Sequence, residues 1–171
     1  YYDAVSFVYK RGLMAGTGDN LFSPNVTTSR GMIVTILYRL DGSPSASSAG
    51  FTDVTSGQWY TDAVNGAAAN DIVAGYGNGL FGPNDTVTRE QMAVILYRYA
   101  QYKGYDTSAS NSLNGYTDVG GVSSWALTAM QWANAEGLIN GTSGTTLSPT
   151  NGATRAEVAQ ILMRFCENFV D

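Results

Sequence analysis

The chain has 171 residues, of which 44% are hydrophobic and 13% are charged, and this composition favours a compact core over a disordered chain. The net charge of −5 at pH 7 argues against nucleic acid or an anionic membrane surface as a partner, because both attract a basic face. No apolar run approaches the roughly 18 residues that a membrane-spanning helix needs, so we expect no membrane insertion.

A short pattern occurs three times in the chain. It runs from Gly16 to Arg30, recurs 59 residues later from Gly75 to Arg89, and recurs after a further 66 residues from Gly141 to Arg155. Each copy contains a Gly-rich stretch, a Phe or Leu two residues before a proline, and a Ser or Thr followed by arginine. A fixed internal period indicates an array of similar units, each too small to bury its own apolar face. The predicted units span residues 1–41, 51–101 and 116–168, together one compact module.

The first unit begins in the middle of the pattern. Its opening Tyr1-Tyr-Asp-Ala-Val5 matches Tyr60-Thr-Asp-Ala-Val64 of the second unit. The preceding part of the second unit, Phe51-Thr-Asp-Val54 and Trp59, has no counterpart in the first unit. We therefore expect the first unit to be incomplete at its start, in a chain cut from a longer protein. Its second half carries an apolar stripe with a 3.6-residue period after Ser29, which predicts a helix there.

The second unit shows the predicted local structure most clearly. A first helix is expected from about 59 to 70, after a flexible spacer at 42–50. Successive glycines at 75–79 predict a turn, because glycine adopts positive φ without steric cost. Thr88 and Gln91 fit a capping box that begins a second helix with a regular apolar stripe.

The third unit follows a Ser- and Asn-rich segment at 104–115 and repeats this order. Its second helix begins with the capping box of Thr154 and Glu157. Cys166 lies on the apolar side of this helix, and we interpret it as a small core residue. Three amphipathic helices of this kind call for a shared core. The sequence therefore predicts an all-α fold of three helix–loop–helix units around a central three-helix bundle.

The residues give little support to catalysis or metal binding. The chain has no histidine, which is the commonest general base and a favoured zinc ligand. Asp53, Asp62 and Asp118 occur singly at turns and helix starts, where aspartate usually caps. The loop from Gly75 to Asp85 holds one carboxylate, which is too few for a calcium site. We predict no enzyme activity, no metal and no cofactor.

The most informative polar residues are the arginines after each cap: Arg30, Arg89 and Arg155. A positive charge in the first turn of a helix opposes the helix dipole, so local stability does not explain it. Two interpretations stay open. The arginines form ion pairs or stacking contacts with a neighbouring unit, for example with Asp53 or Asp118. Alternatively, each guanidinium and the free N–H groups of the helix start together bind an anionic group.

Aromatic residues give a second indication. Trp59 and Trp125 occupy equivalent positions at the start of the first helix of their units, and Tyr76 lies in the Gly-rich loop. We favour packing in the core or between units for the tryptophans, with the indole N–H bonded at the edge. The alternative is a wall for a sugar ring, whose C–H face suits an indole.

Together these motifs resemble the S-layer homology repeat. The second unit carries Phe51-Thr-Asp-Val, the Gly75-Tyr-Gly-Asn-Gly-Leu-Phe-Gly-Pro-Asn loop and Val87-Thr-Arg-Glu90. The third unit carries Thr154-Arg-Ala-Glu157, which is the family's signature without change. The resemblance covers nearly the whole chain, and it implies a pseudo-threefold spindle with grooves between adjacent repeats.

The resemblance also implies a function. Such modules anchor secreted proteins to secondary cell-wall polysaccharide on the bacterial surface, often through a pyruvylated N-acetylmannosamine, so the expected partner is an anionic, pyruvylated cell-wall glycan. The signature arginine meets the pyruvate carboxylate, and loop glycines and a tryptophan line the sugar. The carbohydrate-binding residues implied in this way are Arg89, Arg155, Arg30, Trp59, Trp125, Gly75, Tyr76 and Gly77.

The units depart from the family pattern to different degrees. The first unit has Ser29-Arg-Gly31, which lacks a capping box and places a helix-weakening glycine in the first turn. We therefore expect the grooves of Arg89 and Arg155 to bind better than that of Arg30. The alternative function is a structural or protein-interaction module of a surface layer, with other surface proteins as partners and vestigial glycan grooves.

Overall fold

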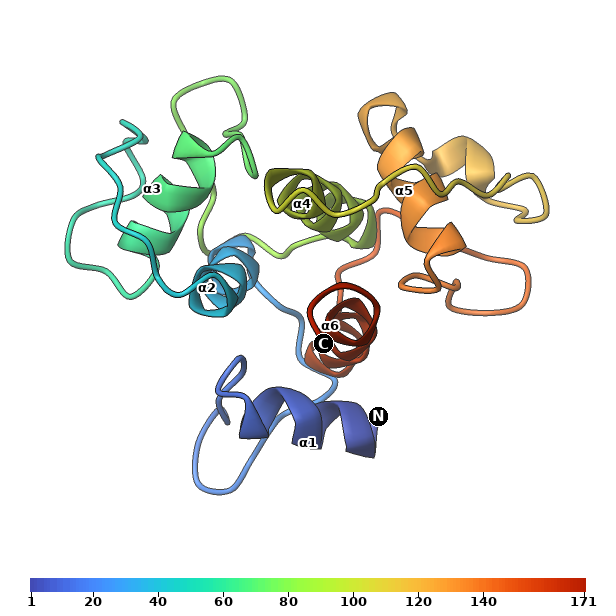
Figure 1. The fold of residues 1–171 in the computed structure, drawn as a ribbon, viewed down its shortest axis with the longest axis horizontal. Coiled ribbons are helices and arrows are strands. Elements are labelled where there is room, and N and C mark those ends of the chain that lie inside the picture. The colour runs from blue at the N-terminus through green and yellow to red at the C-terminus, as the bar shows by residue number, and fades with distance from the viewer.

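The computed structural model describes residues 1–171, and it confirms the all-α fold. Three helices stand together at the centre of Figure 1, and three others lie in separate lobes around them. The six α-helices in chain order are α1 (Tyr2–Lys10), α2 (Arg30–Leu40), α3 (Thr61–Ala69), α4 (Arg89–Tyr102), α5 (Leu127–Ala135) and α6 (Arg155–Phe169). Two short 3₁₀ turns, η1 (Val119–Gly121) and η2 (Ser124–Ala126), precede α5. The central helices are α2, α4 and α6, the second helices of the three units.

The peripheral helices pack across the unit boundaries. Helix α3 lies against α2, α5 lies against α4, and α1 lies against α6 (Figure 1). Each first helix therefore covers the central helix of the preceding unit around the bundle. In this arrangement no unit buries its apolar face alone, as the internal period predicts.

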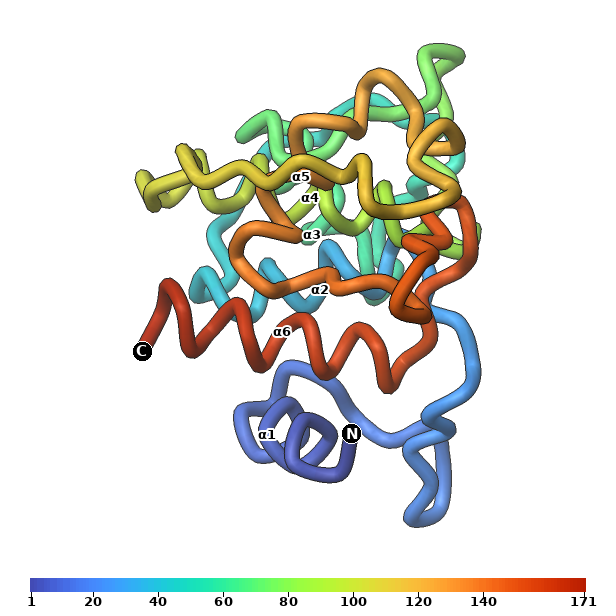
Figure 2. Tube along the Cα trace, turned by 90° about the vertical axis from the view of Figure 1, so that its right-hand side faces the viewer, coloured from blue at the N-terminus to red at the C-terminus, as the bar shows by residue number.

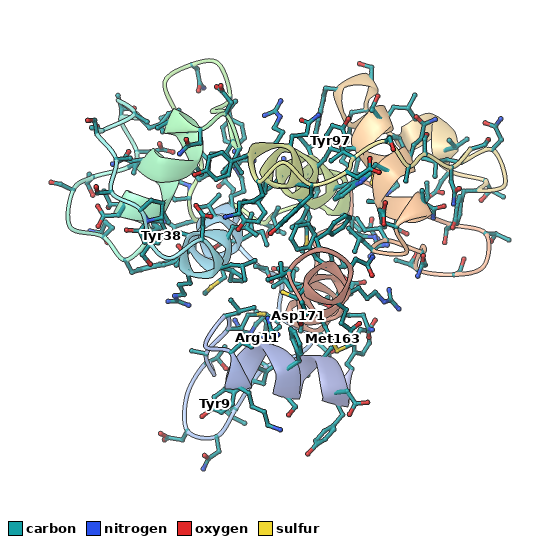
Figure 3. All side chains as sticks on the ribbon, in the orientation of Figure 1. Tyr9, Arg11, Tyr38, Tyr97, Met163 and Asp171 are labelled. Atoms are coloured by element: carbon teal, nitrogen blue, oxygen red, sulfur yellow. The ribbon has the colours of Figure 1, made fainter.

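The contact between α1 and α6 joins the first and last units. Figure 2 shows α6 along its length and α1 nearly end-on, so the two helices cross at a steep angle. At the C-terminal ends of these helices, Arg11 pairs with Asp171 (Figure 3). Ala4 and Val8 are the buried residues of α1. The array of three units is thus closed into a ring by its terminal segments.

The central helices start with the predicted caps. Thr88 and Thr154 each form a complete capping box with Gln91 and Glu157. Ser29 caps α2 through a bond from the Met32 amide at 3.1 Å, and this helix has no capping box, as its sequence indicates. Each cap side chain accepts a hydrogen bond from one of the amide groups that a helix start leaves without an intrahelical partner.

The three segments before these caps form a closed hydrogen-bonded triangle. The amide of Thr28 donates to the carbonyl of Ala153 at 2.8 Å, Ala153 donates to Val87 at 3.0 Å, and Val87 donates to Thr28 at 2.9 Å. All three residues are buried. Since each bond joins two different units, this triangle fixes the relative positions of the three central helix starts.

The core contains one continuous cluster of apolar side chains from all three units. Trp132 is the largest fully buried side chain, and it lies edge-on to Tyr97 and stacked on Phe169. Cys166 is completely buried, which confirms its prediction as a core residue. Burial also raises the pKa of the Cys166 thiol.

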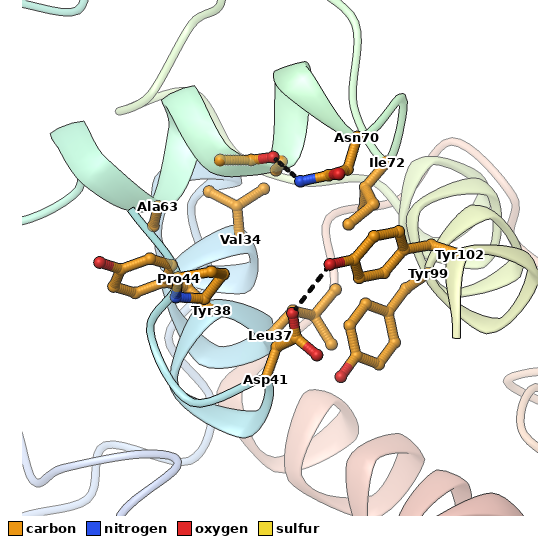
Figure 4. Close-up of a pocket in the computed structure, with 12 residues that line it drawn as sticks. Val34, Leu37, Tyr38, Asp41, Pro44, Ala63, Asn70, Ile72, Tyr99 and Tyr102 are labelled. Carbon is orange, nitrogen blue, oxygen red and sulfur yellow. Dashed lines mark hydrogen bonds between the residues drawn. The ribbon is translucent and has the colours of Figure 1, made fainter. Parts of the chain in front are cut away.

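A narrow seam lies where α2, α3 and α4 meet (Figure 4). The Tyr102 hydroxyl donates to the Asp41 carboxylate at 3.3 Å across one side of this seam. On the other side, the Asn70 side chain donates to the Gly66 carbonyl at 2.8 Å. The cavity is only about 20 Å³, which is room for a single water molecule. It is a gap in helix packing and is too small for a sugar.

Candidate functional site

The arginines at the starts of the central helices link adjacent units. Their exposed fractions are only 6% for Arg30, 4% for Arg89 and 5% for Arg155. Each Nε donates to a carbonyl in the Gly-rich loop region of the next unit around the ring. These bonds are Arg30 to Phe81 at 2.9 Å, Arg89 to Leu147 at 2.9 Å and Arg155 to Phe22 at 2.8 Å.

Further contacts hold these guanidinium groups in place. Arg30 lies between the rings of Tyr76 and Phe81, with its Cζ 4.7 Å and 4.6 Å from the two ring centroids. Arg89 forms an ion pair with Glu157 at 3.4 Å. Burial lowers the pKa of both arginines. The predicted stacking and ion-pair contacts with a neighbouring unit are therefore present.

Asp53 and Asp118 form no ion pair with the cap arginines, so that part of the prediction is wrong. Asp53 accepts the amides of Phe81 and Gly82 at 2.9 and 2.7 Å. Asp118 accepts the equivalent amides of the third unit, both at 2.8 Å. Burial raises the pKa of Asp53, but the bonds from backbone amides and the positive charge of Arg30 together outweigh it, so the pKa lies below its ordinary value. For Asp118 the amide bonds dominate and also lower the pKa.

The helix starts themselves are not free to bind an anion, which corrects the second interpretation of the arginines. The amide of Arg30 donates to the Asp85 carbonyl at 2.8 Å, and the amide of Gly31 donates to the Pro83 carbonyl at 2.8 Å. The other two central helices make the same pair of bonds to the proline turns of their neighbours. Because the cap side chain takes the third amide, each helix start is satisfied by protein.

These close contacts explain the glycine in the first turn of α2. A Cβ at Gly31 would lie 2.8 Å from the carbonyl oxygen of Pro83 and 3.4 Å from the Cβ of Tyr60. The glycine that appears from sequence to be a weakness therefore allows the close approach of the Pro83 turn.

One groove combines arginines with exposed aromatic rings, and we call it the first groove. It lies between the start of α2, the Gly-rich loop of the second unit and the outer face of α4, and its cavity is about 250 Å³. Arg30, Arg98, Gln91, Tyr76 and Trp125 contribute its polar and aromatic lining. The Tyr76 hydroxyl donates to the Asp85 carboxylate at 2.8 Å, which fixes the tyrosine ring over Arg30. The lining contains two arginines and no acidic residue.

A second groove is built from equivalent residues one unit further on. Arg89, Gly141, Glu157 and Arg164 line a cavity of about 240 Å³. Tyr1 also lines it. Glu157 takes the position of Gln91, so this groove contains a carboxylate paired with one of its two arginines.

The third arginine belongs to a differently shaped region. Arg155 donates to the carbonyls of Phe22 and Ala15, and its guanidinium lies 4.6 Å from the centroid of the Phe22 ring. A cavity of about 680 Å³ in this lobe is lined by Val5, Tyr9 and residues of the Gly16–Phe22 loop, and Arg155 does not line it.

Each central helix carries a second arginine that sequence reasoning missed. Arg39, Arg98 and Arg164 each follow a cap arginine by nine residues. Arg39 donates to the Leu13 carbonyl at 3.3 Å, whereas Arg98 and Arg164 have no protein hydrogen-bond partner and line the first and second grooves. The constant spacing was a visible signal. Its meaning depends on the packing, because Arg98 meets Arg30 only where two units join.

The tryptophans correct a further expectation. Trp59 and Trp125 are 55% and 60% exposed, so the favoured core packing is wrong for both. The buried tryptophan is Trp132, which sequence reasoning did not single out. Trp125 lines the first groove with Gly75 and Tyr76, whereas Trp59 packs edge-on against Tyr60 outside both grooves. Gly77 has a φ of +88° in the loop turn, and it lines neither groove.

No group of three or more potential metal-ligating side chains is present. None of the helices has the length and apolar character needed to cross a membrane. The fold and its grooves define a class: an all-α module of three repeats around a shared bundle, with charged and aromatic grooves between units.

Comparison with known proteins then identifies the family. The S-layer homology domain matches residues 1–31, 50–93 and 115–159, well over half of the chain. The chain therefore belongs to the S-layer homology domain family, in three tandem repeats.

Similar proteins contain this module as a small part of their length. The chain is 31% identical to an amylopullulanase of Thermoanaerobacterium thermosulfurigenes over 96% of the chain and 9% of that protein. It is 28% identical to the surface-layer 125 kDa protein of Lysinibacillus sphaericus, over 97% of the chain and 14% of that protein. An S-layer protein of Bacillus thuringiensis subsp. finitimus is 25% identical over 98% of the chain and 20% of its own length. The family and these relatives identify a cell-wall anchoring module located outside the cell, at the cell wall or surface layer.

Proposed function

We propose that this module anchors its protein by binding a secondary cell-wall polysaccharide, and that the first groove receives a sugar carrying a carboxylate. A pyruvylated N-acetylmannosamine has this chemistry. The observation that carries the proposal is the first groove's lining: two arginines, no acidic residue, and the exposed rings of Trp125 and Tyr76 in one cavity of about 250 Å³. The module itself performs no catalysis in this proposal.

The two arginines have different parts in this groove. Arg30 already donates to the carbonyls of Phe81 and Ala74, so its guanidinium is held rigidly at the groove wall. Arg98 donates to no protein group, and its guanidinium is available for a bidentate contact with a carboxylate. We assign Arg98 as the main anion-binding residue and Arg30 as the fixed positive charge beside it.

The aromatic residues suit the uncharged part of a sugar. Trp125 and Tyr76 are 60% and 47% exposed although both are large and partly apolar. An indole face packs well against the C–H face of a pyranose, and the tyrosine is immobilised by its bond to Asp85. Gly75 also lines the groove, and its missing side chain leaves room for the Phe51 ring and the Leu80 carbonyl, each 2.6 Å from where a Cβ would lie.

This proposal reverses the order of the grooves expected from sequence. The second groove has Glu157 beside Arg89, and this carboxylate neutralises one positive charge where an anion would bind. Thr142 stands there in place of Tyr76, so the second groove also lacks the ring that covers the arginine. We expect the second groove to bind the same sugar more weakly.

Co-sedimentation with purified cell-wall sacculi tests the proposal. Arg98→Ala and Trp125→Ala are each expected to weaken binding about tenfold or more, as loss of a charged hydrogen bond does. Arg164→Ala and Trp59→Ala are matched controls at equivalent repeat positions, and both are expected to change binding much less. Removing pyruvyl groups from the sacculi is expected to abolish the difference between Arg98→Ala and the parent protein. Equal binding by all four variants would contradict the assignment of the groove.

A second candidate function is a structural or protein-interaction module of a surface layer. The observation that favours it is that Arg30, Arg89 and Arg155 all bond to a neighbouring unit. These contacts give the three arginines a structural role that needs no glycan. Under this alternative, removal of pyruvyl groups leaves sedimentation unchanged, and retention of the module depends on other surface proteins.

A further inference from the structure

Glu90 is a buried carboxylate that lies beside the first groove but outside its lining. It follows Arg89 in the first turn of α4, is 3% exposed and lines neither groove. No arginine or lysine forms an ion pair with it. Its two oxygens instead accept hydrogen bonds from one residue of the third unit, Oε2 from the Ser123 amide at 2.9 Å and Oε1 from the Ser123 hydroxyl at 2.7 Å. A buried carboxylate is costly unless its oxygens are bonded in this way, so the two residues fix each other in place.

Ser123 begins the turn that carries Trp125. It precedes η2, and the Ala126 amide closes this turn by donating to the Ser123 carbonyl at 2.9 Å. Ala126 is completely buried, and η2 packs against α4. The turn is therefore held at its first residue by Glu90 and at its last residue by burial. Trp125 lies between them and is 60% exposed, so the backbone of the turn determines where its ring stands in the first groove.

The second unit lacks this link. Gly31 occupies the position 59 residues before Glu90, and Gly57 occupies the position 66 residues before Ser123, so neither position has a side chain. The turns also differ in backbone, because φ is +82° at Gly57 and −63° at Ser123. The turn that carries Trp59 is therefore not tied by a carboxylate to the central helix on which its unit packs.

A different residue holds the equivalent turn of the second unit. The Thr61 hydroxyl donates to the Thr55 carbonyl at 2.6 Å and accepts the Gln58 amide at 3.0 Å. Leu127 takes the position of Thr61 in the third unit, and its side chain can make neither bond. The turn held within its own unit carries a tryptophan that lines neither groove, whereas the turn held by Glu90 carries one that lines the first groove.

We propose that Glu90 is a positioning residue for the first groove: its carboxylate holds Ser123 so that the turn presents the Trp125 indole as a wall for the sugar. Glu90 does not touch the sugar and acts only through the tryptophan. The inference rests on the binding role proposed above for the first groove. It adds a residue outside the groove lining to those that determine binding, at the junction of the second and third units.

Indole N–H signals in ¹⁵N NMR spectra of the 171-residue protein test the positioning without any ligand. The chain has three tryptophans; Trp59→Phe and Trp125→Phe assign two signals, and the third belongs to the buried Trp132. In Glu90→Ala we expect the Trp125 signal to shift and broaden, because the turn loses both bonds, while the Trp59 signal stays in place. Thr61→Ala is the matched control. It removes two hydrogen bonds from the other tryptophan turn and is expected to move the Trp59 signal alone.

Co-sedimentation with pyruvylated sacculi tests whether this positioning matters for binding. Glu90→Ala is expected to weaken binding about fivefold, less than the loss of the indole itself, because the ring is displaced and not removed. In a Trp125→Ala background, Glu90→Ala is expected to cause no further loss, since a residue that acts only through the indole then has nothing to position. Thr61→Ala is expected to bind like the parent protein. The midpoint of thermal unfolding is expected to fall in both Glu90→Ala and Thr61→Ala, so lower stability alone does not explain a difference in binding.

Ser123→Ala tests the link from its other side and keeps the carboxylate. It removes the hydroxyl bond and leaves the amide bond, so we expect a smaller shift of the Trp125 signal and a smaller loss of binding. If circular dichroism shows that Glu90→Ala does not fold, Ser123→Ala decides the proposal by the same two measurements.

Failure of this inference and failure of the groove assignment give different results. If Trp125→Ala weakens binding but Glu90→Ala changes neither the Trp125 signal nor binding, Glu90 is not a positioning residue. The same conclusion follows if Glu90→Ala weakens binding equally with and without the Trp125 indole. If Trp125→Ala itself leaves binding unchanged, the groove assignment fails and the binding role of Glu90 fails with it, whereas the indole signal still shows whether Glu90 orients the ring.

Discussion

The first and second grooves are built from equivalent residues of successive units, yet they differ in charge at one decisive position. Gln91 lines the first groove and Glu157 lines the second. Both side chains complete the capping box of their helix, so helix stability accepts either residue. The same position faces the groove and determines whether a carboxylate stands beside the arginines. A repeat can therefore change its ligand preference here without weakening its fold.

The largest expected effect distinguishes the two arginines within the first groove. Arg30→Met removes the bonds to Phe81 and Ala74 and leaves the buried carbonyl of Phe81 without this partner. We expect a loss of about 2–4 kcal/mol in the free energy of unfolding, measured by urea denaturation. Arg98→Met is the control, and its stability is expected to stay within about 0.5 kcal/mol of the parent protein. Equal stability of both variants would show that Arg30 is not a structural link.

The second and third units share an aspartate that accepts two loop amides, and the pH dependence of stability tests this contact in both units. The pKa values of Asp53 and Asp118 lie below their ordinary values because loop amides donate to both carboxylates. The unfolded chain therefore takes up protons at a higher pH than the folded chain. Their stabilisation is fully present above the unfolded pKa, near 4, and is lost as the pH falls through the lower folded values.

We expect the urea concentration at the midpoint of unfolding to decrease as the pH is lowered below about 4. In Asp53→Asn and in Asp118→Asn this decrease is expected to be less steep. The two variants are expected to behave alike, since the amide contacts are alike in the two units. A pH dependence unchanged from the parent protein in either variant would contradict the role of that aspartate.

Two substitutions that keep both capping boxes exchange the residues at this position between the grooves. Gln91→Glu places a carboxylate in the first groove, and we expect it to weaken binding of pyruvylated sacculi about tenfold, or about 1.4 kcal/mol. Glu157→Gln frees Arg89 of its ion pair and is expected to strengthen binding at the second groove. Circular dichroism checks that helix content is retained. Unchanged binding in both variants would mean that the charge at this position does not select the ligand.

Sequence periodicity was sufficient for the fold class, the caps and the central bundle, because these depend on local pattern. The apolar stripe behind Thr88 and the capping box of Thr154 both appear in the structure where the pattern indicates them. The pairing of α1 with α6 was not predicted, since an internal period gives no information about which neighbouring unit a helix covers.

The candidate site was predicted only in part, for the same physical reason. Arg30, Tyr76 and Trp125 were singled out individually, but their meeting in one groove joins all three units. Arg98 was missed because Arg30, the arginine beside it in the groove, lies 68 residues away in sequence. Trp125 was expected in the core because large aromatics are usually buried, and local pattern does not reveal that a helix start faces a groove.

The smallest expected effect lies at the triangle that holds the three units together. Thr28, Val87 and Ala153 occupy equivalent positions there, and the buried hydroxyl of Thr28 has no hydrogen-bond partner. Valine has nearly the shape of threonine, and Val87 shows that the position accepts it. We expect Thr28→Val to raise the free energy of unfolding by about 1 kcal/mol, because it removes a desolvated polar group. Thr28→Ser keeps the hydroxyl, loses a buried methyl group and is expected to destabilise. If Thr28→Val also destabilises, the hydroxyl has a partner in solution, and the first unit contributes a polar contact to the axis that the other two units lack.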